Sequence, residues 1–299
     1  MKLQSALEYL ITYGWVIMII AVVLAALWFF GFFNTATYAP KASPGQCYVA
    51  RPDGPNSTQF MALRGSCGNE APQYVTVFAK QNAYVVAEPP GGQSTSAITV
   101  TAWAYEVSLI GAGACETVVS IQGQDPFHVP WIINAAGGQG SGWLGCGQNV
   151  EAASSMGGVI CAGGLIMPIG HWVFLALTYD QQTEILYQNA TQDCSIAVSS
   201  PISLWPNGNV LIGNGGTGGT AYPFNGYISN VQIYNTSLSA NIISAMYSEG
   251  VGGEPIELQN LIGWWPLNGN PNDYSGNMDN AKANGINFNG GWYQTYITT

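Results

Sequence analysis

The hydrophobic pattern separates one long apolar segment near the N-terminus from a remainder of short, alternating segments. Residues 11–33 form a run of 23 positions without a charged side chain. At about 1.5 Å rise per residue, a helix of this length covers the roughly 30 Å of a bilayer core. Glu8 lies just before this run, near one face of the bilayer. We therefore expect a hydrophobic, membrane-inserted helix over residues 4–34.

Beyond the helix, residues 35–72 are rich in proline and polar side chains and predict a connector with an irregular loop between Cys47 and Cys67. From residue 73 onward, short segments rich in Val, Ile, Thr and aromatic residues predict strands. These segments are residues 74–79, 83–87, 98–105, 117–122, 131–134, 171–179, 184–188, 210–213 and 227–234. A short helix is expected over 239–249, with Ser239 as its N-cap and Gly250 as its stop.

The N-terminal residues resemble the class III signal peptides of archaeal type IV pilin-like precursors. Gln4, Ser5, Glu8 and Leu10 are similar to the Q-x-S-x-E pattern and the apolar segment that follows it in that family. The resemblance implies cleavage of a leader, residues 1–3, so that Gln4 becomes the N-terminus. It also implies that Glu8 neutralises the new α-amino group on a neighbouring helix. Leu3 departs from the small residue usual before the cut, and an uncleaved anchor or a secretory signal are the alternatives.

A second resemblance covers residues 73–299, which look like a laminin-G-like, concanavalin A-like jelly roll. The segments AITVTAWAY, HWVFLALTYD and FNGYISNVQIYNTSLSANIISAMYSEG carry it in that order. It implies two stacked antiparallel sheets, with Trp103 and Trp172 filling the space between them.

The segment LIGWWPLNGNPNDYSGN, residues 261–277, is similar to the opening strand and loop of such domains but comes after the closing helix. We interpret this as a permuted jelly roll whose first strand is supplied by the C-terminal part, the alternative being a truncated second domain. The strand alternation then directs either Ile262, Trp264 and Pro266, or Leu261, Trp265 and Leu267, toward the core.

The composition is typical of an exported surface protein. Charged residues make up 7% of the chain, the net charge is −10, and the 6 Lys and Arg residues are too few to bind nucleic acid. The sequons at Asn56, Asn189 and Asn235 are acceptors for N-glycosylation outside the membrane. Together with the cysteines, they indicate an N-terminus inside the cell and a bulk that lies outside.

Six cysteines follow the apolar helix, and an even number on the exported side predicts disulfides. Proximity in sequence favours Cys47–Cys67 and Cys146–Cys161 and leaves Cys115–Cys194. His128 and His171 have no ligand-like spacing from the thiols, which argues against zinc.

Two ligand sites are considered. Asn270, Asn272, Asp273 and Asn277, with Asn268, offer oxygen ligands that suit Ca²⁺, the only cofactor considered, and the alternative is a loop that bonds to its own backbone. Trp143 and Trp205, on glycine-rich stretches, are candidates for stacking on sugar rings or for the core.

No catalytic residues are expected. The chain lacks the E-x-D-x-x-E strand triplet of the related glucanases and a G-x-S-x-G elbow. The sequence therefore predicts a non-enzymatic, mainly β surface protein. We expect a homo-oligomeric, pilus-like filament at the cell surface, inserted in the cytoplasmic membrane before assembly, whose head binds a glycan or another cell-surface ligand. The alternative is a single-copy, membrane-anchored, lectin-like protein.

Overall fold

The computed structural model describes residues 2–30, 40–68, 70–79, 82–88, 96–110, 115–121, 131–135, 149–153, 160–198, 208–215, 222–286 and 292–294. For residues 2–12, 149, 151–153, 160 and 292–294 it describes the backbone alone. The chain forms two compact units, Met1–Ala39 with Tyr296–Thr299, and Pro40–Thr295, which are treated separately below. We call the second unit the head.

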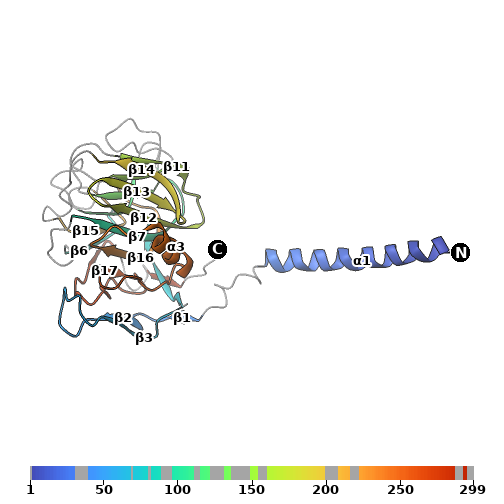
Figure 1. Ribbon diagram of the computed structural model, residues 1–299, viewed down its shortest axis with the longest axis horizontal. Coiled ribbons are helices and arrows are strands. Elements are labelled where there is room, and N and C mark those ends of the chain that lie inside the picture. The colour runs from blue at the N-terminus through green and yellow to red at the C-terminus, as the bar shows by residue number, and fades with distance from the viewer. Residues whose placement is uncertain are drawn as a thin grey trace. The chain divides into compact units, whose positions relative to one another are not determined.

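The first unit contains α1, an unbroken helix of 28 residues, Lys2–Phe29, in agreement with the predicted helix (Figure 1). Its described side chains are apolar around the whole circumference, and Ile17, Val22 and Phe29 are all exposed. Gln4 and Glu8 belong to this helix, but their side chains lie outside the described residues. Within the described part of the chain, no helix has the combined length and apolarity needed to cross a membrane.

The head is a sandwich of two large sheets, as predicted for a mainly β jelly roll (Figure 1). The smaller sheet has the order β11 (Ile160–Ile166), β10 (Asn149–Ala153), β9 (Ile132–Ala135), β8 (Glu116–Ile121), β15 (Val210–Ile212), β6 (Tyr84–Ala87) and β18 (Lys282–Asn284). The larger sheet has the order β14 (Thr191–Ala197), β13 (Thr183–Gln188), β12 (Trp172–Tyr179), β7 (Ile98–Glu106), β16 (Gly226–Tyr234), β5 (Tyr74–Phe78) and β19 (Trp292–Gln294), and β17 (Leu261–Trp265) pairs with β16. Every pairing within the two sheets is antiparallel.

All nine predicted strands are present, and so is the predicted short helix, α3, Ala240–Glu249. Gly250 follows α3 at φ 79°, whereas Ser239 makes no side-chain cap bond. In the two large sheets the prediction missed β10, β11 and β14, and also the short C-terminal strands β18 and β19. The sequences of β10, β11 and β14, which are NVEAA, ICAGGLI and TQDCSIA, contain small or polar residues where a strand pattern needs large apolar ones.

The core between the sheets is filled by alternate residues of each strand. In β7, Val100, Ala102 and Ala104 point inward, and they share one cluster with the fully buried side chains of Trp131 and Trp265. Small residues on β7 thus face large rings from other strands. The residues of β7 in between point to the outer face of the larger sheet.

The C-terminal segment forms part of this sandwich. Strand β17 lies antiparallel to β16, with Trp265 opposite Val231. A register shift in this pairing, where Ile233 lies opposite Gly263 and Tyr234 opposite Leu261, breaks the strict alternation along β17. The core therefore takes Ile262, Trp265 and Leu267, a mixture of the two predicted sets.

The N-terminal lobe of the head, residues 40–72, has regular structure that the sequence did not predict. Strand β1 (Lys41–Ala42) pairs in parallel with β4 (Ala71–Pro72), and β2 (Cys47–Ala50) pairs with β3 (Ala62–Gly65) as a hairpin. The expected irregular loop between Cys47 and Cys67, and the expected start of regular structure near residue 73, are therefore wrong. Residues with little hydrophobic alternation form this hairpin because a disulfide and the C-terminal loop support it.

Candidate functional site

The outer face of the larger sheet is divided into a covered part and an open part. Helix α3 covers one part, where Trp103 of β7 stacks on Tyr247 at 5.7 Å between ring centroids and 19° between planes. Phe174 of β12 packs against the same Trp103 at 5.4 Å. Trp103 is buried beneath the helix and is not available to a ligand.

The open part carries three aromatic side chains from three adjacent strands, Trp172, Tyr105 and Tyr227, which we call the aromatic row after the order of their strands. The rings themselves form a compact triangle, since the centroids of Trp172 and Tyr227 are 6.5 Å apart. They lie on adjacent strands, because Trp172 of β12 and Tyr227 of β16 both pair with Tyr105 of β7. The ring centroids of Tyr105 are 5.7 Å from Trp172 and 5.3 Å from Tyr227. All three side chains are half-buried, so each keeps part of its ring surface open.

Two glycines lie beside the row, for different reasons. A Cβ atom on Gly226 would lie 2.0 Å from the carbonyl oxygen of Tyr105, so only glycine permits this close pairing of β16 with β7. Gly170 lies just before β12 at φ 79°, a backbone conformation that favours glycine, while a Cβ there would make only an ordinary contact of 3.7 Å with the Tyr105 hydroxyl.

The chemistry that such a row can perform is binding. An exposed ring face offers an apolar surface that packs against the C–H groups of a sugar, while the Tyr hydroxyls and the Trp N–H can hydrogen-bond. The only other concave feature that we consider is a pocket of about 50 Å³ between the N-terminal lobe, Trp264 and Tyr274. Ligand sites for drug-sized molecules measure several hundred Å³, so this pocket is too small for a sugar ring.

One of the two sequence predictions about tryptophans needs correction, and the other is not tested. Trp103 and Trp172 do not fill the space between the sheets, since both point to the outer face. Both faces of β7 and β12 carry apolar residues, so their alternation does not reveal which face is internal. The two tryptophans proposed for sugar stacking, Trp143 and Trp205, lie outside the described residues.

Sequence reasoning did not identify Tyr105 and Tyr227 as candidates. The available signal was positional: each is an aromatic residue at the end of a predicted strand, and Tyr105 is two residues from Trp103. The strand order that makes the two tyrosines and Trp172 adjacent is a property of the tertiary fold.

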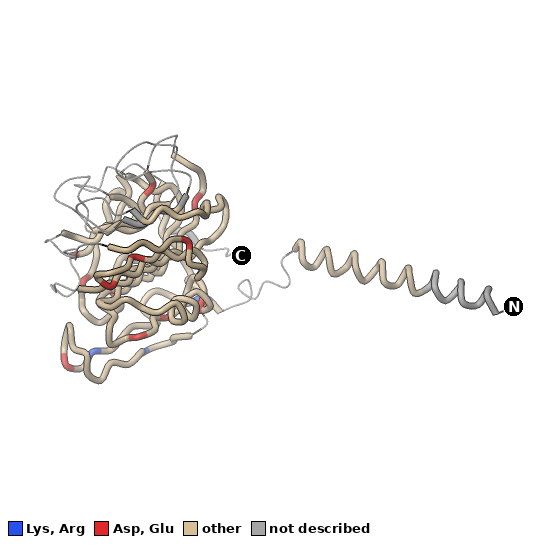
Figure 2. The backbone as a smooth tube through the Cα atoms, turned by 45° about the horizontal axis from the view of Figure 1, so that its top comes forward, with Lys and Arg blue, Asp and Glu red and all other residues tan. Residues whose placement is uncertain are grey.

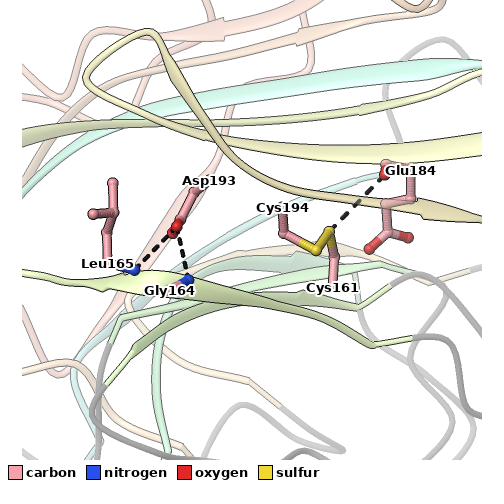
Figure 3. The surroundings of a disulfide bond; sticks show 6 residues. All are labelled: Cys161, Gly164, Leu165, Glu184, Asp193 and Cys194. Atoms are coloured by element: carbon pink, nitrogen blue, oxygen red, sulfur yellow. Dashed lines mark hydrogen bonds between the residues drawn. A yellow bond between two sulfur atoms is a disulfide. The ribbon is translucent and has the colours of Figure 1, made fainter.

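A disulfide joins Cys47 to Cys67, as predicted. The other two predicted pairings, Cys146–Cys161 and Cys115–Cys194, are wrong because Cys161 is bonded to Cys194, with 5.6 Å between the Cα atoms (Figure 3). These two cysteines lie on β11 and β14, the edge strands of the two sheets. Cys115 is also disulfide-bonded, and Cys146 lies outside the described residues.

Asp193 reinforces the same edge. Its Oδ1 atom accepts hydrogen bonds from the backbone N–H groups of Gly164 and Leu165, at 2.8 and 3.0 Å (Figure 3). The disulfide and these two bonds connect the two edge strands where the sheets are open. The disulfides indicate an oxidising, extracytoplasmic location for the head.

The predicted calcium ligands are used by the protein itself. Asp273 Oδ1 accepts hydrogen bonds from the backbone of Trp264 and Ser275, and its Oδ2 accepts from the Ser275 hydroxyl and the Asp279 N–H. The Asn277 Oδ1 accepts from Asn56, and Asn270 bonds to Asn272 and Tyr274. Each Asp273 oxygen already accepts two hydrogen bonds from protein groups, so this loop does not fit a calcium site. The geometry corresponds to the alternative, a loop that bonds to its own backbone.

The sequons differ in their surroundings. Asn56 is exposed in the N-terminal lobe, whereas Asn189 turns the β13–β14 hairpin and accepts a hydrogen bond from the Phe174 N–H through its Oδ1. Asn235 is half-buried directly after β16. Glycosylation of all three stays a prediction. So does the expectation that the protein is not an enzyme; His171 is exposed at the start of β12, and His128 lies outside the described residues.

Charge is sparse on the head. Figure 2 shows acidic residues spread over the described part of the sandwich and few basic ones. Phosphate groups are bound mainly by clustered basic side chains, and the absence of a nucleic-acid partner stays a prediction.

Two stacked antiparallel sheets of this topology define a jelly-roll β-sandwich domain. Residues 79–244, more than half of the chain, match the laminin-G-type model of the concanavalin A-like lectin/glucanases superfamily. The chain therefore belongs to this superfamily. The matched range ends before β17, the strand that completes the pairing of β16.

Solved structures support the same fold. A protein of Bacteroides ovatus assigned to carbohydrate binding is similar with a TM-score of 0.59 and 17% identity, over 80% of this chain and 65% of that one. This chain thus spans just under two thirds of that protein.

Two smaller domains match less well. Domain 4 of the arabinanase AbnA from Geobacillus stearothermophilus, solved with arabinotriose, has a TM-score of 0.41 and 20% identity over 67% of this chain and 81% of that one. CBM40 of the Ruminococcus gnavus IT-sialidase, solved with α2,3-sialyllactose, has a TM-score of 0.43 and 14% sequence identity, over 57% of this chain and 94% of that one. No curated protein matches the chain.

Proposed function

We propose that the head is a glycan-binding domain and that the aromatic row is its binding surface. The observation that carries the proposal is the adjacency of three partly open rings, Trp172, Tyr105 and Tyr227, on neighbouring strands. The three clustered rings supply one apolar contact surface on the outer face of the sheet. Membership of a superfamily that includes lectins, and the fold shared with the Bacteroides ovatus protein, support the proposal.

The residues around the row favour a neutral glycan. The neighbours of the three rings on the same face are Ser229, Phe174 and Trp103, which carry no charge. Recognition then depends on ring contact and on hydroxyl hydrogen bonds instead of ion pairing. Binding should therefore change little with ionic strength.

Replacing Trp172 or Tyr227 by alanine is expected to weaken glycan binding about two- to twelvefold, because each variant removes one stacking surface worth roughly 0.5 to 1.5 kcal/mol. Binding is measured by screening a glycan array with the protein and then by titrating the best ligand. Phe60→Ala is the matched control, since this aromatic side chain is 80% exposed on the N-terminal lobe. An array without any bound glycan, or variants that bind as the wild type does, would contradict the proposal.

We further propose that the protein assembles into a surface filament through α1, with the heads presented outward. A helix that is apolar on every side is stable only when other apolar groups surround it, and parallel copies of the same helix provide them. The exposed Ile17, Val22 and Phe29 support this proposal. So does the resemblance of the first residues to pilin-like precursors.

The assembly proposal gives a role to Glu8. Glu8→Gln should leave the head folded but lower filament yield, because the buried α-amino group of Gln4 then lacks a counter-charge. Electron microscopy of surface filaments measures the yield, and Asn34→Gln is a control with an unchanged net charge. Normal filaments from Glu8→Gln would refute the pairing, and wild-type protein that forms no filaments would favour a single-copy surface lectin.

A further inference from the structure

One aromatic ring of the N-terminal lobe is directed into solvent by an unusual backbone. Among the large apolar side chains described in the head, Phe60 is the most exposed, at 80%. Its φ is 56°, in the left-handed region, which a residue with a bulky side chain rarely adopts. Asn56, four residues earlier, has a φ of 62°. Such conformations cost free energy and persist only where the surrounding structure holds them.

Arg51 holds this loop in place. Its Nη1 atom donates to the carbonyl oxygen of Ser57 at 2.6 Å and to Sδ of Met61 at 3.5 Å. Because one nitrogen binds both groups, the two ends of the segment that contains Phe60 are kept close together. The ring therefore stays beside the turn that carries Asn56, instead of swinging away from it.

The side chain of Asn56 is accessible on the same loop. The residue is exposed, and its amide group makes no hydrogen bond within the described part of the chain. Its backbone N–H donates to Asn277 Oδ1 at 2.9 Å, which fixes the turn on the C-terminal segment. Thr58, the third residue of the sequon, is exposed as well. Both side chains that N-glycosylation requires are therefore open to a transferase.

The other two sequons are less accessible. Asn189 is half-buried, its Oδ1 accepts from the Phe174 N–H at 2.9 Å, and its own N–H donates to the Phe174 carbonyl at 2.8 Å. Asn235 is also half-buried, and its N–H donates to the carbonyl of Asn260 at 2.9 Å. Of the three acceptor residues, Asn56 is the one with an exposed side chain.

We propose that Asn56 carries an N-linked glycan and that the first sugars of this glycan pack on the ring of Phe60. In the modification, Asn56 Nδ2 forms a bond to the anomeric carbon of a lipid-phosphate-linked oligosaccharide. The bond between that carbon and the phosphate oxygen breaks, the lipid phosphate leaves, and one amide proton is released. The C–H face of a sugar packs well on an open aromatic face. The protein's own glycan then covers the ring that its side chains leave open.

The surroundings of the ring suit a sugar better than a protein partner. Thr58 and Gln59, both exposed, offer a hydroxyl and an amide to the sugar hydroxyls. One ring with neutral neighbours is far smaller than the about 800 Å² that each partner buries in a stable protein interface, whereas one ring face matches one sugar. The site lies on the N-terminal lobe and is separate from the aromatic row, so neither proposal depends on the other.

The first test measures where glycans are attached. The full chain is produced in a host that attaches N-glycans to exported proteins, and its peptides are analysed by mass spectrometry. The peptide that contains Asn56 should carry a glycan, and Asn56→Gln should remove it. A glycan on Asn189 with none on Asn56, or no glycan on any of the three sequons, would overturn the proposal.

Thermal melts then test the packing on Phe60. The glycosylated wild type should melt about 2 to 4 °C above Asn56→Gln, because the contact between sugar and ring stabilises the folded state. In a Phe60→Ala background, Asn56→Gln should leave the melting temperature unchanged. Ile169→Ala, at a side chain 51% exposed on another segment, is the matched control and should keep the full difference.

All three substituted side chains are exposed, so the variants are expected to fold. A glycan-dependent difference that is equal with and without the Phe60 ring would show that the sugars do not contact it, and would overturn the packing. A Phe60→Ala variant that loses association between copies, while Asn56→Gln retains it, would assign the ring to a protein interface and would also overturn the proposal.

Discussion

Truncation of the chain after Gly253 is expected to prevent the head from folding. The truncated chain loses β17, and with it Trp265, Leu267 and Leu261, which are all at most 1% exposed. Truncating a single tryptophan in such a position to alanine costs about 3 to 5 kcal/mol, and a whole domain has a stability of about 5 to 15 kcal/mol. The loss of three such side chains exceeds what the remaining contacts supply.

The truncation also removes strands that protect sheet edges. β18 pairs with β6 and β19 pairs with β5, so both sheets would end in unpaired strands. Unpaired edges and an uncovered apolar face lead to aggregation. Size-exclusion chromatography and thermal melts of residues 40–253 and 40–299 measure the effect. A shorter chain that stays monomeric and melts cooperatively at the same temperature would show that the last segment is an appendage.

A point variant tests the packing of one side chain without removing the C-terminal strands. Trp265→Ala in the full chain should be destabilised by about 3 to 5 kcal/mol, whereas Met278→Ala, at a side chain 67% exposed, should be close to neutral.

Replacing Asp273 by alanine is expected to destabilise the head by about 3 to 5 kcal/mol. The carboxylate organises the C-terminal loop, since it accepts four hydrogen bonds from Trp264, Ser275 and Asp279. Hydrogen bonds to a charged group contribute about 1.5 to 3 kcal/mol each, but part of this is recovered by rearrangement and water. The variant also removes the negative charge beside Arg51, whose guanidinium bonds to the carbonyls of Ser275 and Leu261.

Chemical denaturation measures this loss, with Asp53→Ala as a control at an exposed aspartate. The loss should be the same in EDTA and in calcium, because the partners of Asp273 are protein groups. A loss that disappears in EDTA would mean that Asp273 acts through a bound ion, as the sequence alone suggested.

The sequence predicted the strands whose own apolar residues alternate. It missed strands that form because of contacts with other strands. Residues 98–105 and 227–234 carry enough Val, Ile and aromatic residues to specify strands by themselves. Strand β14, with Gln192, Asp193 and Cys194, is formed because β13 offers it an edge and β11 a disulfide. Such a strand is specified by tertiary contacts, which no local pattern records.

Sequence reasoning did not identify the correct disulfide partner or the aromatic row, because both depend on tertiary contacts. Proximity in sequence favoured Cys146 as the partner of Cys161, but closure of the sandwich brings β14 beside β11 and joins Cys161 to Cys194. The aromatic row likewise required the order of three strands that are distant in sequence.

The Cys47–Cys67 disulfide has a mechanical consequence for a protein pulled between its N-terminal helix and a bound glycan. Force enters the head at Pro40 and first loads the parallel pair of β1 and β4, where Lys41 lies opposite Ala71. If that pair separates, the disulfide prevents the 20-residue stretch between its cysteines from extending. Fully stretched, that stretch would add about 70 Å to the tether. The disulfide therefore limits how far the tether can extend under force. Reducing conditions would remove this limit and make the tether longer and more easily stretched.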